Sequence, residues 1–272
     1  MSKRRAPRGV IGVVHVPPMP GDPRHEQGGF GEVERFAMAD AEALVAGGVD
    51  AIIIENFGSA PFSKGVGVAR IPPHQIALLT LLVRSVASLG VSVGVNCLRN
   101  DARSALGIAA VAGASFVRVN IHSGAYVTDQ GLIEGEADET LRYRSSIGAS
   151  HVAILADVLV KHASPLAPLT ATDATHDVVT RGLADAVIVT GRATGAPVDR
   201  ALLEEVSHAA HGATVLLGSG LTPALADSLA PLAHGAIVGS WLKRDGVLEA
   251  PVDAARVKEL IAAVRGKFLA ST

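Results

Sequence analysis

Cysteine is almost missing from this 272-residue chain: Cys97 stands alone, so no internal disulfide can form. Such usage is typical of a protein kept in a reducing compartment, and we expect a cytoplasmic location. Aromatic residues are also scarce, at 3%, whereas apolar residues make up 49% of the sequence. The core must therefore consist of Val, Ile, Leu and Ala, the residues that fill parallel sheets and their covering helices.

An excess of charge of one sign is missing as well. The 24 basic and 26 acidic residues give a net charge of −2, which argues against a dedicated nucleic-acid-binding protein because such proteins usually carry a basic face. One basic run, Lys3, Arg4, Arg5 and Arg8, is interpreted as a solvated tail, with a phosphate-seeking arm as the alternative. The longest apolar stretch, 76–93, is interrupted by Arg84 and predicts a helix and a strand, not a membrane span.

The sequence does contain one unit repeated eight times: a short β-branched run, a loop and an amphipathic helix. The predicted strands are 10–16, 51–55, 91–97, 116–121, 152–157, 186–190, 214–217 and 236–238. The predicted helices are 31–47, 72–89, 100–112, 136–149, 173–182, 199–210, 222–231 and 252–266. This alternation requires parallel strands joined by right-handed crossovers. We therefore predict an α/β fold, a single (β/α)₈ TIM barrel over residues 10–272 behind a flexible tail of residues 1–9, with an open doubly wound sheet as the alternative.

Polar side chains recur at the carboxyl ends of the predicted strands. Because side chains alternate along a strand, those of one parity should meet at the barrel mouth. The fourth strand shows this most clearly, with Arg118, Asn120 and His122 on one face and Val117 and Val119 on the other. The groups expected at the mouth are His15, Glu55, Asn96, Arg118, Asn120, His122 and Asp157. The alternative is a structural network in which Arg118 neutralises Glu55 or Asp157.

These residue types predict acid–base chemistry. Glu55, Asn96, Arg118, Asn120, Asp157 and Lys161 are the catalytic candidates, and His15, Asn56 and His122 are the substrate-binding candidates. The carboxylates of Glu55 and Asp157 suit general acid–base catalysis, with Asp157 preferred, or a divalent cation such as Mg²⁺, and spacing leaves both open. Arg118 would stabilise developing negative charge. Lys161 would neutralise a phosphate or form a Schiff base, unless it is only a solvated loop lysine.

Glycine-rich turns follow the last predicted strands. Gly218-Ser219-Gly220 follows the seventh strand and Gly239-Ser240 follows the eighth, and Gly191 lies in the run Thr190-Gly191-Arg192-Ala193-Thr194-Gly195 after the sixth. Glycine lets backbone amides approach a ligand closely, and the seventh and eighth strand ends are where barrels of this kind hold phosphate. We therefore assign substrate phosphate to Gly191, Gly218, Ser219, Gly220, Gly239 and Ser240, with plain chain-reversing turns as the alternative.

Seven runs together resemble the BtpA/SgcQ family over nearly the whole chain. They are residues 10–21 (VIGVVHVPPMPG), 50–56 (DAIIIEN), 118–124 (RVNIHSG), 128–131 (TDQG), 156–162 (ADVLVKH), 181–186 (RGLADA) and 218–222 (GSGLT). The resemblance implies a barrel of the ribulose-phosphate-binding type. It also implies two different roles, because the family is named for a protein needed to accumulate photosystem I, whereas other members look like enzymes of sugar or nucleoside metabolism. The resemblance does not identify any catalytic residue in this chain.

The function predicted from the residues is an enzyme that acts on a small phosphorylated metabolite, a sugar phosphate or a nucleoside-derived phosphate. Isomerisation, lyase chemistry and glycosyl transfer all fit the acid–base groups. The alternatives are a photosystem I assembly factor that performs no chemistry and a sensor that binds the phosphorylated ligand without turnover. The oligomeric state stays open, a homo-oligomer included.

Overall fold

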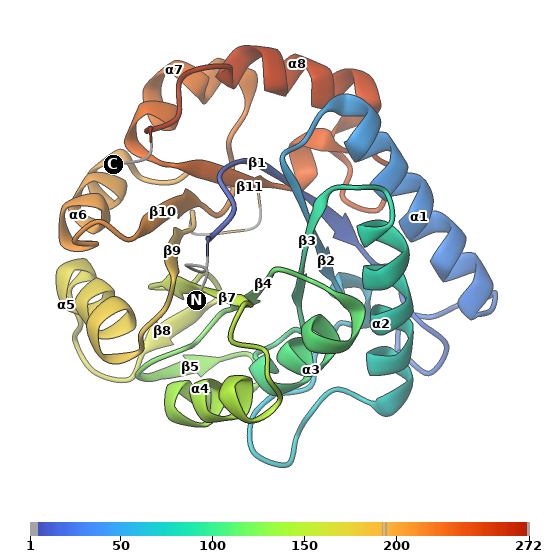
Figure 1. Cartoon of the computed structure of the whole chain (residues 1–272), viewed down its shortest axis with the longest axis horizontal. Coiled ribbons are helices and arrows are strands. Elements are labelled where there is room, and N and C mark those ends of the chain that lie inside the picture. The colour runs from blue at the N-terminus through green and yellow to red at the C-terminus, as the bar shows by residue number, and fades with distance from the viewer. Residues whose placement is uncertain (1–4, 192, 194, 271–272) are drawn as a thin grey trace.

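The β-branched runs of the sequence form the wall of a barrel (Figure 1). Over residues 5–191, 193 and 195–270, which the computed structural model describes, eight parallel strands close in the order β1-β11-β10-β9-β7-β4-β3-β2. They are β1 (Gly9–His15), β2 (Ala51–Glu55), β3 (Ser92–Asn96), β4 (Phe116–Val119), β7 (Ala153–Val158), β9 (Ala186–Val189), β10 (Thr214–Leu217) and β11 (Gly235–Val238). The predicted (β/α)₈ barrel is confirmed.

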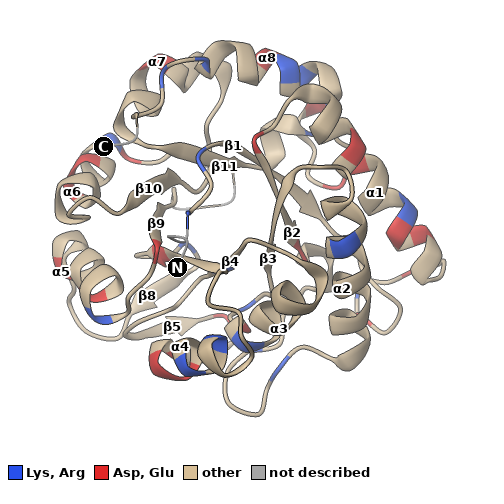
Figure 2. Ribbon diagram, in the orientation of Figure 1, with Lys and Arg blue, Asp and Glu red and all other residues tan. Residues whose placement is uncertain are grey.

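Helices surround the strands, and charged side chains lie on their outer faces (Figure 2). They are α1 (Phe30–Gly47), α2 (Pro73–Ala87), α3 (Ala102–Ala112), α4 (Ala137–Ser146), α5 (Ala171–His176), α6 (Arg200–Ala209), α7 (Ala226–Leu229) and α8 (Ala254–Val264). The helix predicted over 222–231 is only α7 between two 3₁₀ turns, Pro223–Leu225 and Ala230–Leu232. Pro231 accounts for the early end of α7, because proline has no N–H to donate within a helix, whereas Pro223 stands at the first position of its turn, where proline is tolerated.

Two shells of apolar side chains follow from strand alternation. One parity fills the barrel interior with Ile11, Val13, Ala51, Ile53, Phe116, Ala153, Leu155, Ala186, Ile188, Leu216 and Ile237, and the other packs beneath the helices. Gly94 belongs to the interior parity, and a Cβ there would lie 2.1 Å from Phe116 Cε2. The glycine therefore makes room for the one ring in the interior cluster. The polar side chains that continue the interior parity beyond it face the mouth.

The segment between β4 and α4, where no strand was predicted, forms a hairpin. Strands β5 (Ala125–Thr128) and β6 (Gly131–Glu134) are antiparallel, and β8 (Ala163–Pro165) adds a third strand to β5. Gly131 has φ +87°, a left-handed conformation that suits glycine at the turn. A small cluster of Ile121, Tyr126, Ile133 and Val160 packs the hairpin onto the barrel. The hairpin therefore covers part of the mouth beside the loop that carries Lys161.

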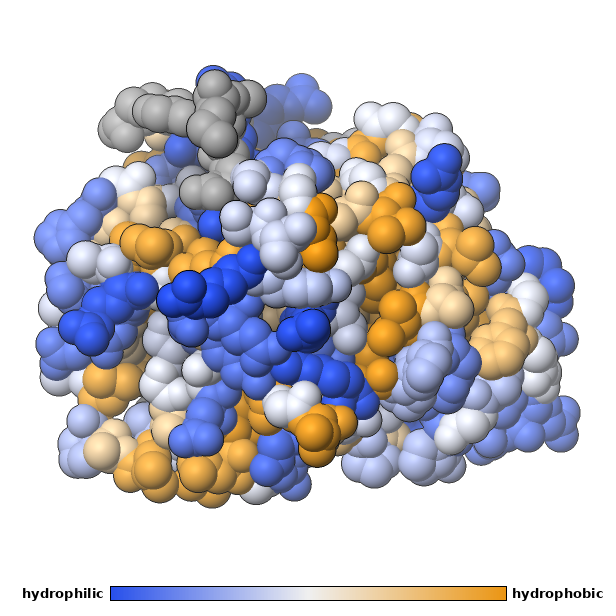
Figure 3. Space-filling view, turned by 60° about the horizontal axis from the view of Figure 1, so that its bottom comes forward, coloured by the Kyte–Doolittle hydropathy of each residue, from blue (hydrophilic) through white to orange (hydrophobic). Residues whose placement is uncertain are grey.

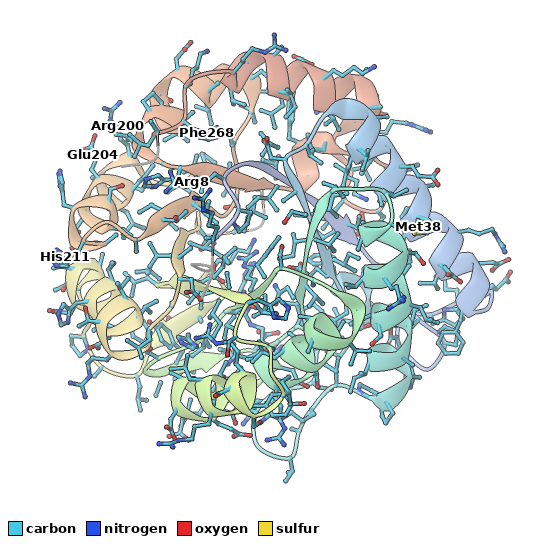
Figure 4. All side chains as sticks on the ribbon, in the orientation of Figure 1. Arg8, Met38, Arg200, Glu204, His211 and Phe268 are labelled. Atoms are coloured by element: carbon cyan, nitrogen blue, oxygen red, sulfur yellow. The ribbon has the colours of Figure 1, made fainter. Side chains whose placement is uncertain are left out.

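The predicted tail, as far as it is described, contacts the barrel. Strand β1 already includes Gly9, and Ala6 packs against the interior cluster. Figure 4 places Arg8 near the middle of the barrel ring, whereas Arg200 and Glu204 lie on its outer edge, where their side chains pair at 2.8 Å. Lys3 and Arg4 lie outside the described residues.

One face of the molecule mixes hydrophilic and hydrophobic side chains without a broad apolar area (Figure 3). Among the described residues, no helix combines the length and the hydropathy that a bilayer crossing requires.

Candidate active site

One cavity of about 400 Å³ opens at the carboxyl ends of the barrel strands. Its lining combines the polar side chains of the mouth with the glycine turns after β10 and β11. The lining includes His15, Glu55, Arg99, Arg118, Asn120, Lys161, Gly218, Ser219, Gly220, Gly239, Ser240 and Trp241. The two halves of the predicted site, which come from separate parts of the chain, therefore share one space.

A buried ion pair forms the floor of this cavity. The Arg118 guanidinium donates to both Asp157 oxygens, at 3.2 and 3.0 Å, and Asn120 Nδ2 donates to Asp157 Oδ2 at 2.7 Å. Burial by itself lowers the pKa of Arg118, but the carboxylates of Asp157 and Glu55 outweigh burial and raise it. The Asp157 side chain is fully buried and does not line the cavity. Asp157 therefore holds Arg118 and Asn120 in place, and it offers no oxygen to the cavity as the general base predicted for this position would.

Glu55 is the carboxylate that reaches the cavity. Its Oε2 accepts a hydrogen bond from Asn96 Nδ2 at 2.7 Å and lies 4.0 Å from Arg118 NH1. Asn96, predicted as catalytic, is 1% exposed and does not line the cavity, so it orients Glu55 from below. Asn120 also has an unused acceptor: its Oδ1 is buried and has no hydrogen-bond partner within the described part of the chain. Glu55 and Asn120 thus offer acceptors to a ligand.

The predicted Mg²⁺ site does not fit this geometry. Arg118 lies between Glu55 and Asp157, 4.0 Å from one carboxylate and 3.0 Å from the other. A cation in that position repels a metal ion and occupies the Asp157 oxygens. Among the described residues, no group of three His, Cys, Asp or Glu side chains is arranged to hold a metal. The donor set suits an anion better than a cation.

Lys161 presents a free amine to the same cavity. Among the described residues its Nζ makes no hydrogen bond or ion pair, while its main chain is fixed by a bond from its amide to Thr190 Oγ1 at 3.2 Å. Burial lowers the pKa of Lys161, and the Arg118 charge lowers it further, against the opposing effect of Glu55 and Asp157. Lys161 is therefore a half-buried residue of the cavity wall.

Arg99 is a cavity residue that the sequence argument missed. It is 5% exposed, and its NH2 donates to the backbone carbonyl of Lys161 at 2.8 Å. It lies three residues beyond the end of β3, where the side-chain alternation of the strand no longer predicts direction. The available signal was an arginine in a loop that follows a strand, which places it on the mouth side of the barrel.

His15 faces the cavity as a neutral ring. Burial, followed by the nearby Lys243, Lys161 and Arg118 charges, lowers its pKa to about 3. Its Nδ1 is buried without a partner in the described structure. A Cβ on Gly239 would lie 2.6 Å from His15 Cε1, so the ring fits only because this residue has no side chain. His15 can therefore donate or accept a hydrogen bond but carries no charge at neutral pH.

The turn after β10 is held closely against the segment around Ala196. Gly220 has φ +71°, and a Cβ there would lie 2.3 Å from the Ala196 carbonyl oxygen. Ser219 Oγ accepts from the Gly191 amide at 3.0 Å and donates to the Ala196 carbonyl at 3.1 Å. Gly191 therefore serves the turn itself and does not line the cavity, because its amide is already used. Arg192 and Thr194 of the same run lie outside the described residues.

Free backbone donors remain where the two turns meet. Among the described residues, the amides of Gly220 and Ser240 donate no hydrogen bond. Trp241, the next residue after Ser240, also lines the cavity, and its buried Nε1 has no partner there. Such donors suit the oxygen atoms of an anion.

A family model for the BtpA family matches residues 6–266. The chain belongs to this family. It is 48% identical over 256 residues to the Photosystem I biogenesis protein BtpA of Synechocystis sp., covering 94% of this chain and 87% of that protein. Two solved structures from Pyrococcus furiosus have the same fold. N-(5'-phosphoribosyl)anthranilate isomerase has a TM-score of 0.55 at 11% identity, covering 95% and 98% of the two chains. Thiamine phosphate pyrophosphorylase has a TM-score of 0.55 at 12% identity, covering 94% and 95%.

Two residues predicted to bind substrate lie elsewhere in this BtpA-family barrel. Asn56 comes one residue after Glu55, so it has the opposite parity, and its side chain bonds to Gln75 Oε1 at 3.1 Å and to the Leu98 amide at 2.7 Å. His122 lies beyond the end of β4, where alternation stops, and its Nε2 donates to the Gly182 carbonyl at 2.8 Å. Neither lines the cavity. Asn56 instead holds the loop that presents Arg99.

Proposed function

We propose that this BtpA-family barrel is an enzyme that acts on a small phosphorylated metabolite, a sugar phosphate or a nucleoside-derived phosphate. One observation carries the proposal: a single cavity is bounded by glycine turns on one side and by Glu55, Arg118 and Lys161 on the other. The names of the two barrels with the same fold include phosphoribosyl and thiamine phosphate groups, which supports the proposal by analogy of fold.

The phosphate would bind to the free amides of Gly220 and Ser240, which leaves the reacting carbons over the floor of the cavity. Glu55 would act as the general acid and base, because it is the carboxylate that lines the cavity. Arg118, fixed by Asp157, would stabilise negative charge that develops on an oxygen of the substrate. Asn120 Oδ1 would accept a substrate hydroxyl. Isomerisation, lyase chemistry and glycosyl transfer each need such a proton transfer.

Binding is tested first, by thermal shift and calorimetry with inorganic phosphate, ribose 5-phosphate and unphosphorylated ribose. A ligand at about a hundred times its dissociation constant adds about 2.7 kcal/mol of stability. For a chain of this size that corresponds to a rise in melting temperature of roughly 5–10 °C. We expect the phosphorylated sugar to bind and ribose not to bind. If none of a broad panel of sugar and nucleoside phosphates shifts the melt, the proposal is wrong.

A second candidate is favoured by the 48% identity to a protein named for photosystem I biogenesis. In that case the cavity would sense a phosphorylated ligand for an assembly role without turning it over. The two functions separate in a Glu55→Gln variant, assayed by phosphorus and proton NMR on the compounds that bind. If the protein is an enzyme, we expect Glu55→Gln to leave ligand affinity unchanged and to reduce turnover by roughly 10²–10⁴-fold. Glu32→Gln, on the exposed first turn of α1, is the matched control. Binding without turnover in the wild type would favour the sensor.

A further inference from the structure

Two cationic side chains that line the cavity, Arg99 and Lys161, form no ion pair with a carboxylate of the described residues. Arg99 is 5% exposed, its Nε is buried without a partner, and its NH2 bonds only to a backbone carbonyl among the described residues. Lys161 Nζ has no partner there either, although Lys161 supplies that carbonyl. The two positive side chains therefore line the same cavity, where Arg99 is buried and Lys161 is half-buried.

The nearby carboxylates do not neutralise this pair. Asp157 is occupied by Arg118 and Asn120, and Glu55 lies beside Arg118 and Asn96. Asp129, on the turn between β5 and β6, acts on Arg99 through space but forms no ion pair with it in the described structure. Buried charge without a partner is unfavourable, and proteins retain it mainly where a ligand supplies the opposite charge.

The positions of these cations in the barrel define a second end of the site. Arg99 follows β3 and Lys161 follows β7, on either side of β4, which carries Arg118. The phosphate turns follow β10 and β11, farther round the barrel order. A ligand held on the turns would thus extend over Glu55 and Arg118 toward Arg99 and Lys161.

We propose that the substrate carries a second anionic group, a carboxylate or a second phosphate, which binds between Arg99 and Lys161. This inference rests on the proposed function and narrows it to phosphorylated metabolites with an anion at each end. Arginine suits such a group because its planar fork binds carboxylate and phosphate oxygens in pairs.

Calorimetry with matched probes tests the inference. Ribose 5-phosphate carries one anionic group, 6-phosphogluconate adds a carboxylate and fructose 1,6-bisphosphate adds a second phosphate. We expect at least one of the doubly anionic probes to bind about tenfold or more tightly than ribose 5-phosphate, since a charge-assisted hydrogen bond contributes that much. Which of the two gains affinity identifies the second group.

Variants of Arg99 and Lys161 test whether the second anionic group binds between these two side chains. Arg99→Gln should remove the advantage of the doubly anionic probe and leave ribose 5-phosphate affinity unchanged, and Lys161→Gln should do the same if Arg99→Gln fails to fold. Arg142→Gln removes the same charge from an exposed pair on α4 and should change nothing. If ribose 5-phosphate binds but neither second anion adds affinity, the inference is wrong and the proposed function stands. If neither these probes nor any compound of the broad panel of sugar and nucleoside phosphates binds, both are wrong.

Discussion

At the scale of single residues, Lys161 is a charge that the free protein stabilises poorly. Burial and the Arg118 charge lower its pKa below the usual 10.5, so at pH 7 the folded state bears a charge that the unfolded state solvates better. We therefore expect Lys161→Met to raise the free energy of unfolding at pH 7 without ligand. The gain should shrink as the pH rises and vanish above 10.5, where the amine is neutral in both states. Urea unfolding at pH 7 and pH 10 measures it.

The control for this experiment is Lys258→Met, on the exposed face of α8, which should show no gain that depends on pH. The same Lys161→Met variant should bind doubly anionic phosphorylated ligands less tightly, so that stability and function change in opposite directions. A loss of stability at pH 7 in Lys161→Met would mean that the folded protein compensates the ammonium, and it would remove the argument for an anion beside Arg99.

At the scale of elements, the turn after β10 depends on the absence of a side chain at Gly220. A Cβ there meets the backbone of Ala196 at 2.3 Å, and φ is +71°. Gly212 has a similar φ of +87° but open space around it. Gly212→Ala should cost about 1–2 kcal/mol from the left-handed conformation alone. Gly220→Ala should cost more and weaken phosphate binding, as measured by urea unfolding and calorimetry. Equal phosphate affinity in Gly220→Ala and wild type would exclude this turn as the phosphate site.

The elements also show what the sequence can predict. Strands such as β2 and β10 were predicted to the residue, because a β-branched run is bounded by turn residues on both sides. Inward parity correctly placed His15, Glu55 and Arg118 at the mouth, since each lies within a strand. Parity failed beyond the strand ends, at His122 and Arg99, because only tertiary contacts fix direction in a loop. It also could not show that Asp157 lies beneath Arg118, because depth within one face depends on strand stagger.

At the scale of the whole molecule, a buried ion pair joins the first and last units of the barrel. Lys243, just after the Gly239-Ser240 turn, pairs with Asp40 on α1, and both side chains are 1% exposed. Asp40 also accepts from the Val252 amide at 2.7 Å, so one carboxylate ties α1 to the segment that leads into α8. The pair therefore ties α1 to the Gly239-Ser240 turn, which we propose binds phosphate.

This link makes a prediction about stability and affinity together. Asp40→Ala leaves Lys243 buried and unpaired, which should cost about 3–5 kcal/mol in urea unfolding and weaken phosphate binding by displacing the turn before it. Asp227→Ala, which breaks the exposed pair with Lys267, should change neither quantity. The double variant Asp40→Leu with Lys243→Met replaces both charges by apolar groups and should regain most of the stability, because the loss comes from the unpaired ammonium. If the double variant is as unstable as Asp40→Ala, the stability was lost with the hydrogen bond from the Val252 amide and not with the ion pair.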